Sequence, residues 1–281
     1  MNLIQDKAQV TLSVSCVYYD TDIDIFEKTL ESIASALVFA KNQKILDDYE
    51  LHLINNNPEK ELAFQLCIEK HKNKLGNLII HSGHGNIGYG QANNIAIIQT
   101  ECKYHLILNP DIVTETQAIK FGIEYLELHP YIGLAAPNVT NSNGDIEYLA
   151  KRMPSLLIIF LRGLNNQYLN RVFHKKLGRY AYKDKIPRDE PLEIELASGC
   201  FMLCRSSMLK RVGGFSKEYF LYFEDFDLSK KINNLGKLYY LPKMKICHLG
   251  GYAVKKGLKH TKLFLTSYLI FRNRNHKHIY R

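Results

Sequence analysis

The first 110 residues alternate short apolar runs with helix-like segments, and this alternation constrains the fold most strongly. Between the runs, apolar residues recur at helical spacing over 26–40, with Asp22 or Asp24 as the candidate N-cap. They do so again over 59–74 and up to about Thr100. The apolar runs, rich in β-branched residues, lie at 10–19, 51–54, 78–81 and 104–108. This order predicts right-handed βαβ units and an α/β fold whose central sheet is mainly parallel and flanked by helices.

Polar residues follow each apolar run, at the edge where parallel sheets bind their ligands. These residues are Tyr18 to Asp20, Asn55 to Asn57, the turn at 82–90 and Asn109 to Asp111. Four ordinary loops would also account for them. Their convergence on one edge of the sheet favours a binding site.

A glycine-rich turn, Asn86-Ile87-Gly88-Tyr89-Gly90, opens the helix that continues through Asn93 and Asn94. Glycines between a strand and a helix let backbone N–H groups approach a phosphate at the helix N-terminus. The spacing differs from the dinucleotide-binding fingerprint, and a plain glycine turn is an equally good interpretation.

Asp111 follows Pro110 at the end of an apolar strand. One carboxylate at such a position suits Mg²⁺ or Mn²⁺, which need few protein ligands when diphosphate oxygens and waters complete the shell. Capping of the next helix is the alternative interpretation. His248 precedes Gly250 and Gly251 after another short strand. It is a structural histidine, or a further metal ligand if the chain folds back to Asp111.

Three carboxylates, Glu224, Asp225 and Asp227, lie among Phe220, Tyr222, Phe223 and Phe226. Carboxylates among aromatic side chains are costly to bury unless they are paired or used. Such surroundings raise a carboxylate pKa and suit a general base. An acidic helix N-terminus stabilised by the helix dipole is compatible with the same pattern.

The rest of the chain is less regular. Residues 138–192 hold ten Lys and Arg and are predicted to form a mobile connection or insertion. A helix is predicted over 115–129 and a strand over 132–137. The remaining expected elements are a strand over 193–204, helices over 205–212 and 225–235, and short strands at 238–241 and 245–249.

The net charge of +9 is unevenly distributed, because no Asp or Glu follows Asp227 while 13 Lys and Arg do. Residues 254–281 are predicted to be a basic amphipathic tail, in which basic clusters flank the apolar run 263–271. Such a tail can bind an anionic membrane surface, or dock on the catalytic domain or in a homodimer. Basic charge confined to a tail, with no recognised motif, argues against nucleic-acid binding.

No stretch reaches the 18 or so apolar residues that span a bilayer, and the N-terminus lacks signal-peptide order. The sequence therefore predicts a cytoplasmic protein, peripheral on the inner face of the plasma membrane if the tail binds lipid.

Taken together, these segments resemble the family 2 glycosyltransferases, close to the bacterial rhamnosyltransferase-like branch. The resemblance runs from Val10 to Gly251. The matching segments are Tyr18-Tyr19-Asp20, Asn55 to Pro58, Asn86 to Asn94, Leu108 to Asp111, Ser198 to Arg205, Gly213 to Leu228 and His248 to Gly251. Their order and spacing carry the resemblance more than any one of them does.

The resemblance implies a GT-A fold over 1–253, with a nucleotide-binding half (1–112) and an acceptor and catalytic half (113–253). It implies an inverting transfer of a sugar, with L-rhamnose as a candidate, from a nucleotide-diphosphate donor to a saccharide or lipid-linked saccharide of a bacterial surface polysaccharide. A catalytically silent sugar-nucleotide-binding protein is the alternative.

By the same analogy, Asp111 and His248 hold a divalent cation, Mg²⁺ or Mn²⁺, and Asp225 is the general base, with Glu224 or Asp227 next in line. The residues expected near the nucleotide are Tyr18, Asp20, Asn55, Asn86, Gly88, Tyr89, Gly90, Asn93 and Asn109. Asn55 replaces an aspartate common in the family, which leaves base preference open. Asp111 is the only carboxylate of its motif, so we expect modest metal affinity.

Overall fold

The computed structural model describes residues 9–164, 166–250 and 258–275. Its first part alternates strands and helices, as predicted. In order, these are β1 (Thr11–Tyr18), α1 (Ile23–Asn42), β2 (Asp48–Asn55), a 3-10 turn (Pro58–Lys60), α2 (Glu61–Leu75), β3 (Leu78–His81), α3 (Tyr89–Gln99) and β4 (Tyr104–Leu108). Of the two candidate N-caps, Asp22 is the cap, because its carboxylate accepts the Asp24 N–H at 2.9 Å.

The second part is more irregular. It contains β5 (Ile112–Thr114), α4 (Ala118–Leu128), β6 (Ile132–Asn141), β7 (Ile146–Glu147), α5 (Leu156–Leu164), α6 (Gln167–Val172), α7 (His174–Tyr180), β8 (Leu192–Ile194), β9 (Phe201–Arg205), α8 (Ser206–Arg211), α9 (Glu224–Asn233), β10 (Lys237–His248) and α10 (Leu258–Asn275). The two short strands predicted at 238–241 and 245–249 are one strand, β10. Its pairing register shifts between Leu241 and Lys245, where Pro242 cannot donate a backbone hydrogen bond.

Of the two alternatives predicted for 138–192, a mobile connection or an insertion, the structure corrects the first. The segment holds β7 and three helices. Arg152 donates to both carboxylate oxygens of Asp184, at 2.9 and 3.0 Å, and Ile159 of α5 is buried in an aromatic cluster. These long-range contacts order the segment, and no sequence periodicity announces them.

The strands form one sheet in the order β3-β2-β1-β4-β9-β6-β10-β5, with β7 and β8 pairing at β6 and β10. The expected α/β class is confirmed, but the sheet is mixed. Six strands (β1, β2, β3, β4, β6 and β10) share one direction, and β5, β7, β8 and β9 oppose it. Strands joined by a short turn, such as β6 and β7, must run antiparallel.

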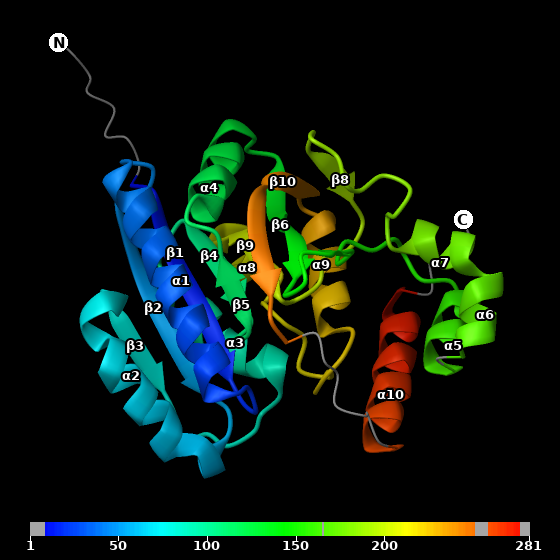
Figure 1. Ribbon diagram of the computed structural model, residues 1–281, viewed down its shortest axis with the longest axis horizontal. Coiled ribbons are helices and arrows are strands. Elements are labelled where there is room, and N and C mark those ends of the chain that lie inside the picture. Colours follow the sequence, from blue (N-terminus) through cyan, green and yellow to red (C-terminus); the bar gives the residue numbers. More distant parts are fainter. Residues whose placement is uncertain (1–8, 165, 251–257, 276–281) are drawn as a thin grey trace.

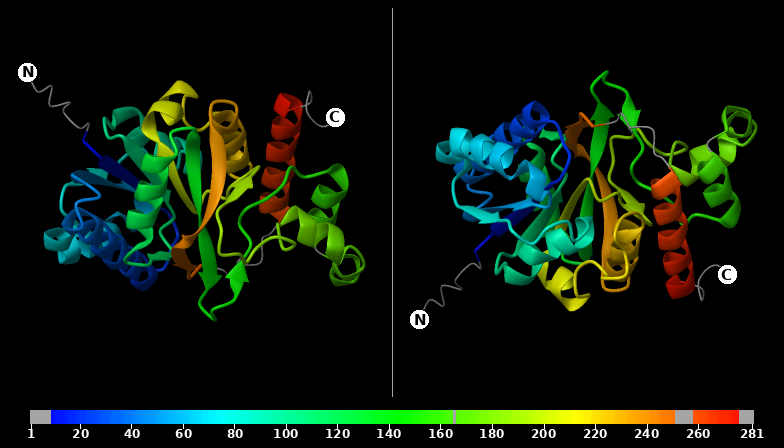
Figure 2. Two further views of the ribbon diagram at one scale, coloured as in Figure 1. Left: turned by 90° about the horizontal axis from the view of Figure 1, so that it is seen from above. Right: turned by 90° about the horizontal axis from the view of Figure 1, so that it is seen from below.

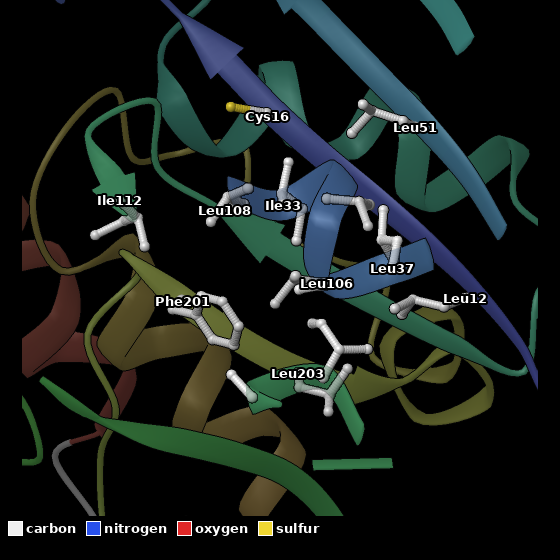
Figure 3. Packing of buried hydrophobic residues seen from close by; sticks show 14 of the residues in the cluster. Leu12, Cys16, Ile33, Leu37, Leu51, Leu106, Leu108, Ile112, Phe201 and Leu203 are labelled. Carbon is white, nitrogen blue, oxygen red and sulfur yellow. The ribbon is translucent and has the colours of Figure 1, made fainter. Parts of the chain in front are cut away.

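Helices cover both faces of the sheet (Figures 1 and 2). On one face, α1, α2 and α4 bury a large core that includes Phe26, Ile33 and Phe64. Figure 3 shows part of this core, where Ile33 and Leu37 of α1 lie against strand residues such as Leu106. On the other face, α3, α8 and α9 pack a second core. These layers leave the carboxyl ends of β1, β2 and β4 side by side, since Tyr18 pairs with Asn55 and Cys16 with Leu108.

The C-terminal helix α10 docks on the protein and lies beside α5 to α7 at one end of the molecule (Figures 1 and 2). Its Phe264 and Phe271 rings lie 5.2 and 5.4 Å from the Phe223 ring, and its Ser267 hydroxyl donates to the Leu221 carbonyl at 2.8 Å. Docking on the catalytic domain was one of the predicted alternatives for the tail. Residues 251–257 and 276–281, which carry Lys255, Lys256, Lys277 and Arg281, lie outside the described residues.

Candidate active site

A cavity of about 560 Å³ opens at the carboxyl edge of the parallel strands. Its walls come from the ends of β1, β2 and β4, from the turn before α3, and from two segments of the second half. Residues that line it include Tyr19, Asp20, Asn56, Asn86, Gly88, Tyr89, Asn109, Asp111, Phe220 and Gly250. The fold thus brings together segments more than 200 residues apart, and the cavity lies at the sheet edge where ligand binding was predicted.

Five of the nine residues predicted near the nucleotide line this cavity: Asp20, Asn86, Gly88, Tyr89 and Asn109. The other four, Tyr18, Asn55, Gly90 and Asn93, do not. The Tyr18 ring is buried against Phe26 and Phe64, with centroids 4.8 and 5.5 Å away. Asn93 is fully buried and accepts from the Ser15 hydroxyl at 2.6 Å. Both side chains are buried in the core and do not reach the cavity surface.

Asn56 and Tyr19 line the cavity where Asn55 and Tyr18 do not; both lay within the predicted ranges 55–57 and 18–20 but were not among the nine residues named. Asn56 donates to the Asn86 side-chain oxygen and accepts from the Ile87 N–H, both at 3.1 Å, so it joins β2 to the glycine turn. Asn55 instead bonds Glu61 and the Asn57 N–H. Tyr19 follows the last residue of β1 and Asn56 the last residue of β2. Both therefore lie in the loops at the carboxyl edge of the sheet, where ligand binding was predicted.

The glycines of the 86–94 turn allow a close approach to the segment after α8. Gly88 has φ +84°, and a Cβ there would lie 2.6 Å from the Phe220 carbonyl oxygen. A Cβ on Gly90 would meet the Phe215 side chain at 2.8 Å. Asn94 accepts from the Phe215 N–H at 2.8 Å and donates to its carbonyl at 2.9 Å. The turn at 86–94 therefore packs directly against the segment 215–220 at the cavity wall.

Asp111 and His248 meet, although they are far apart in sequence. The His248 Nε2 lies 3.3 Å from an Asp111 carboxylate oxygen, and its Nδ1 lies 2.7 Å from Glu147. Burial opposes the charged form of His248, but Asp111 and Glu147 outweigh it and raise the pKa to about 9. Glu147, which the sequence did not single out, fixes the ring with Nε2 towards Asp111. A histidine ligand oriented by a carboxylate in this way is a common metal-site arrangement.

Asp111 and His248 offer some, but not all, of the ligands that a hard cation needs. The second Asp111 carboxylate oxygen is buried and has no hydrogen-bond partner among the residues that the structure describes. Within the described residues, no group of three or more His, Cys, Asp and Glu side chains is placed to hold a metal by itself. Two protein ligands completed by diphosphate oxygens and waters match the chemistry of Mg²⁺ and Mn²⁺.

Glu224 and Asp225 line a second cavity, of about 200 Å³. Asp225 accepts the Gly199 N–H at 2.9 Å and the Phe226 N–H at 2.8 Å, which fixes its carboxylate at the start of α9. Glu224 is buried, and one of its oxygens has no hydrogen-bond partner in the described part of the chain. Burial raises the pKa of both carboxyl groups, and the neighbouring Asp225 raises that of Glu224 further. This pair has the properties of a proton acceptor.

The residues just before this pair have an unusual backbone. Tyr222 and Phe223 have φ of +71° and +65°, a left-handed conformation that costs about 1–3 kcal/mol at each bulky residue. The Phe223 ring is buried among Phe264, Tyr268 and Phe271 of α10. Packing against α10 therefore holds the bend that presents Glu224 and Asp225.

Asp227, predicted as a possible base, lines neither cavity. It is buried and accepts from the Ser216 hydroxyl at 2.5 Å. It also lies 3.4 Å from Arg274 and 3.8 Å from Lys231. Asp225 and Asp227 are two positions apart on α9 and have different surroundings. Asp225 lines a cavity, whereas Asp227 contacts Arg274 of α10 and Ser216 of the loop before α9.

The two cavities are neighbours. The Tyr89 hydroxyl, in the wall of the larger one, donates to the Gly199 carbonyl at 2.7 Å, and the Gly199 N–H donates to Asp225 in the smaller one. A Cβ on Gly199 would lie 3.2 Å from the Asp225 Cβ and 3.4 Å from the Tyr89 ring. A single glycine thus separates the wall of the Asp111 cavity from the candidate base.

The chain is similar in sequence to known glycosyltransferases. No protein-family model matches the chain. Rhamnosyltransferase WbbL of Escherichia coli is 27% identical over 252 residues, which cover 82% of this chain and 87% of that protein. The chain is related to the bacterial rhamnosyltransferases. An N-acetylglucosaminyl-diphospho-decaprenol L-rhamnosyltransferase of Mycobacterium tuberculosis is 29% identical over 177 residues, 58% of this chain and 56% of that protein.

Solved structures confirm the GT-A fold that the rhamnosyltransferase resemblance implied. GalNAc-T7 with UDP, GalNAc and Mn²⁺ has a TM-score of 0.64 at 14% identity, covering 98% of this chain and 51% of that one. S. aureus TarS has a TM-score of 0.56 at 15% identity, covering 96% of this chain and 75% of the TarS fragment. At these identities the structures establish the fold alone.

Proposed function

We propose that this chain is an inverting glycosyltransferase that moves a sugar from a nucleoside-diphosphate donor to a hydroxyl of a saccharide acceptor. The observation that supports the proposal is that Asp111, in contact with His248, lines a cavity whose Tyr89 wall is hydrogen-bonded through Gly199 to Asp225. Because the chain is related to rhamnosyltransferases, L-rhamnose is the first donor sugar to test. The process that we propose for the enzyme is the synthesis of a bacterial surface polysaccharide.

The donor binds in the larger cavity. Asp20, Asn56 and Asn109 surround it at the strand ends, and the turn from Asn86 to Tyr89 forms one wall. Most of these residues belong to 1–112, the half proposed to bind the nucleotide. The half from 113 to 253 supplies His248 and Asp225, and the acceptor enters from its side.

Asp111 and His248 hold a divalent cation in this proposal. When bound, Mg²⁺ or Mn²⁺ stabilises the negative charge that develops on a leaving nucleoside diphosphate. The buried, unpartnered oxygen of Asp111 supports this assignment, because a bare carboxylate oxygen is costly without a cation or donor.

Asp225 takes the proton of the acceptor hydroxyl as its oxygen attacks the anomeric carbon and the bond to the diphosphate breaks. A single displacement of this kind inverts the anomeric configuration. The raised pKa of Asp225 makes it a stronger proton acceptor than an ordinary aspartate. The Gly199 and Phe226 N–H groups orient it without occupying all of its lone pairs.

The alternative is a catalytically silent protein that binds sugar nucleotides. The strained bend at Tyr222 and Phe223 favours the enzyme, because backbone strain of this kind is typical of functional sites. A silent protein would have no use for a buried carboxyl pair beside the donor cavity.

A peripheral membrane contact on the cytoplasmic side fits a lipid-linked acceptor. No helix in the described part of the chain is long and apolar enough to cross a bilayer. The neighbouring helices α5 and α10 nevertheless expose Leu156, Phe160, Leu265 and Leu269. The inner face of α10 is occupied by its own chain, so a homodimer through that face is not part of the proposal.

Flotation with vesicles that contain anionic phospholipid tests this contact. We expect Leu265→Ser with Leu269→Ser to float less than the unmodified chain, while Val38→Ser, an exposed change on α1, floats equally. Equal flotation of all three would remove α10 from the membrane contact.

A donor screen tests the proposed function directly. UDP, dTDP and GDP sugars are added with and without Mn²⁺, and the melting temperature and sugar transfer are measured. A ligand that binds the folded state alone raises its melting temperature. We expect a Mn²⁺-dependent rise with at least one donor, and transfer from that donor. A rise without transfer to any acceptor would favour the silent binding protein.

A further inference from the structure

The smaller cavity is lined by two cations as well as by its carboxylates. Lys151 and Arg162 line it together with Glu224, Asp225 and Phe264. Lys151 is anchored by a backbone bridge to Leu196, with hydrogen bonds of 2.9 and 3.0 Å, and Arg162 projects from α5. Burial raises the pKa of Asp225 and the charge of Arg162 lowers it, but the proposed proton transfer from an acceptor hydroxyl to Asp225 assigns no step to either cation.

The two cations flank one aromatic ring. The Lys151 ammonium lies 5.7 Å and the Arg162 guanidinium 5.6 Å from the centroid of the buried Tyr180 ring. Arg162 also donates to the Tyr180 hydroxyl at 3.0 Å, and Lys151 donates to the Tyr148 carbonyl. Within the described residues neither cation forms an ion pair. Burial, together with Arg162 and Lys183, lowers the pKa of Lys151 to about 8.

The charge of Arg162 disfavours the charged form of Lys151, so the two cations repel each other, and an anion with several oxygens would relieve that cost. Guanidinium and ammonium groups are the side chains that best bind phosphate oxygens. The cavity volume of about 200 Å³ leaves room between the cations and the carboxylates. A single ligand spanning it would place an anionic group on Lys151 and Arg162 and a hydroxyl on Asp225.

We infer that Lys151 and Arg162 bind a phosphate or diphosphate group carried by the acceptor sugar. The inference rests on the proposed function, since it places the acceptor in the Asp225 cavity. Two sources share this chemistry: a soluble sugar phosphate and a lipid-linked sugar diphosphate. The exposed Leu156 and Phe160, on the same helix as Arg162, offer apolar surface for the chain of the second.

Binding of inorganic diphosphate in metal-free buffer tests the site, using calorimetry on the full chain. Without a divalent cation, the carboxylate of Asp111 disfavours diphosphate in the donor cavity, so the measured binding reports on the cations. We expect Lys151→Met and Arg162→Gln each to weaken binding by about tenfold or more, in line with the loss of a charge-assisted hydrogen bond. Arg171→Gln, an exposed change on α6 outside the cavity, should bind as the unmodified chain does.

Equal binding by all four proteins would overturn the inference. So would loss of Mn²⁺-dependent nucleoside diphosphate binding in Arg162→Gln, because the cations would then belong to the donor. Melting temperatures check that each variant folds, and Arg162→Lys, which keeps the charge, should restore part of the affinity. Farnesyl diphosphate binding more tightly than inorganic diphosphate identifies a lipid-linked source, and equal affinity identifies a soluble one.

The outcomes separate this inference from the proposed function. If no sugar nucleotide is bound or used, but diphosphate binding still depends on both cations, the proposed function fails and the anion site stands. If transfer occurs while diphosphate binding is insensitive to both substitutions, the anion site fails and the proposed function stands.

Discussion

Two carboxylates two residues apart on α9 have opposite surroundings. Asp225 is held by backbone N–H groups at a cavity, whereas Asp227 accepts from a hydroxyl and lies near two cations in the interior. The sequence presented them as equivalent members of one acidic cluster. Only the helical turn, which rotates each side chain by about 100° from the last, assigns one to the cavity and the other to the core.

We predict that Asp225→Asn lowers turnover by roughly a hundredfold or more, the usual effect of losing a general base. Because the amide keeps the size of the carboxylate, donor binding should survive. Initial rates of sugar transfer and calorimetric donor binding measure the two effects. Near-normal turnover would assign the base to Glu224.

Asp227→Asn is the matched change at the neighbouring carboxylate. It removes a charged acceptor from the Ser216 hydroxyl and leaves Lys231 without its carboxylate, so we expect about 2 kcal/mol less unfolding free energy. Turnover per folded molecule should stay near normal. Denaturant unfolding with parallel rate measurements tests this. A stable but inactive variant would refute the structural role.

The pH dependence follows from the same carboxyl pair. A base acts only when ionised, and burial raises the pKa of Asp225, so the protonated, inactive form persists to higher pH. We predict that kcat/KM rises with pH through an apparent pKa above the ordinary aspartate value of about 4. Glu224 interacts with Asp225, so this pKa belongs to the pair. In Asp225→Asn the limb should disappear from the residual rate, and an unchanged limb would point to another group.

At the scale of elements, α10 has a function that the tail sequence concealed. Its apolar run was predicted to contact a membrane, the catalytic domain or a second copy of the chain, and Phe264, Tyr268 and Phe271 pack against the bend at Tyr222 and Phe223 in the catalytic domain. Composition showed that the tail has apolar residues but could not show which of them face inward, since contacts 40 or more residues apart decide it.

We predict that Phe271→Ala lowers unfolding free energy by about 3–5 kcal/mol, because Phe271 is fully buried. It should also lower turnover at temperatures where the protein remains folded, since the left-handed bend before Glu224 loses its support. Circular dichroism melts and transfer rates measure both. Thr266→Ala, an exposed change on the same helix, is the control. Unchanged turnover in folded Phe271→Ala would mean that α10 does not position the base.

At the scale of the whole molecule, much of the architecture was readable from sequence. The alternation over the first 110 residues located four strands and three helices, and the sheet-edge rule placed Asp20, Asn109 and Asp111 at one cavity. The rest depended on tertiary contacts. Strand β9 runs against its neighbours, β5 is three residues long, and Glu147 reaches His248 from a short hairpin. No local pattern encodes such pairings.

The central claim is that Asp111 and Asp225 act on one sugar nucleotide, the first holding the cation and diphosphate and the second accepting the proton. Calorimetric titration of a nucleoside diphosphate with Mn²⁺ into the unmodified chain, Asp111→Ala and Asp225→Asn tests it most directly. The account predicts equal binding by the unmodified chain and Asp225→Asn, and weaker, chelator-insensitive binding by Asp111→Ala. Equal, Mn²⁺-dependent binding by all three proteins would contradict it.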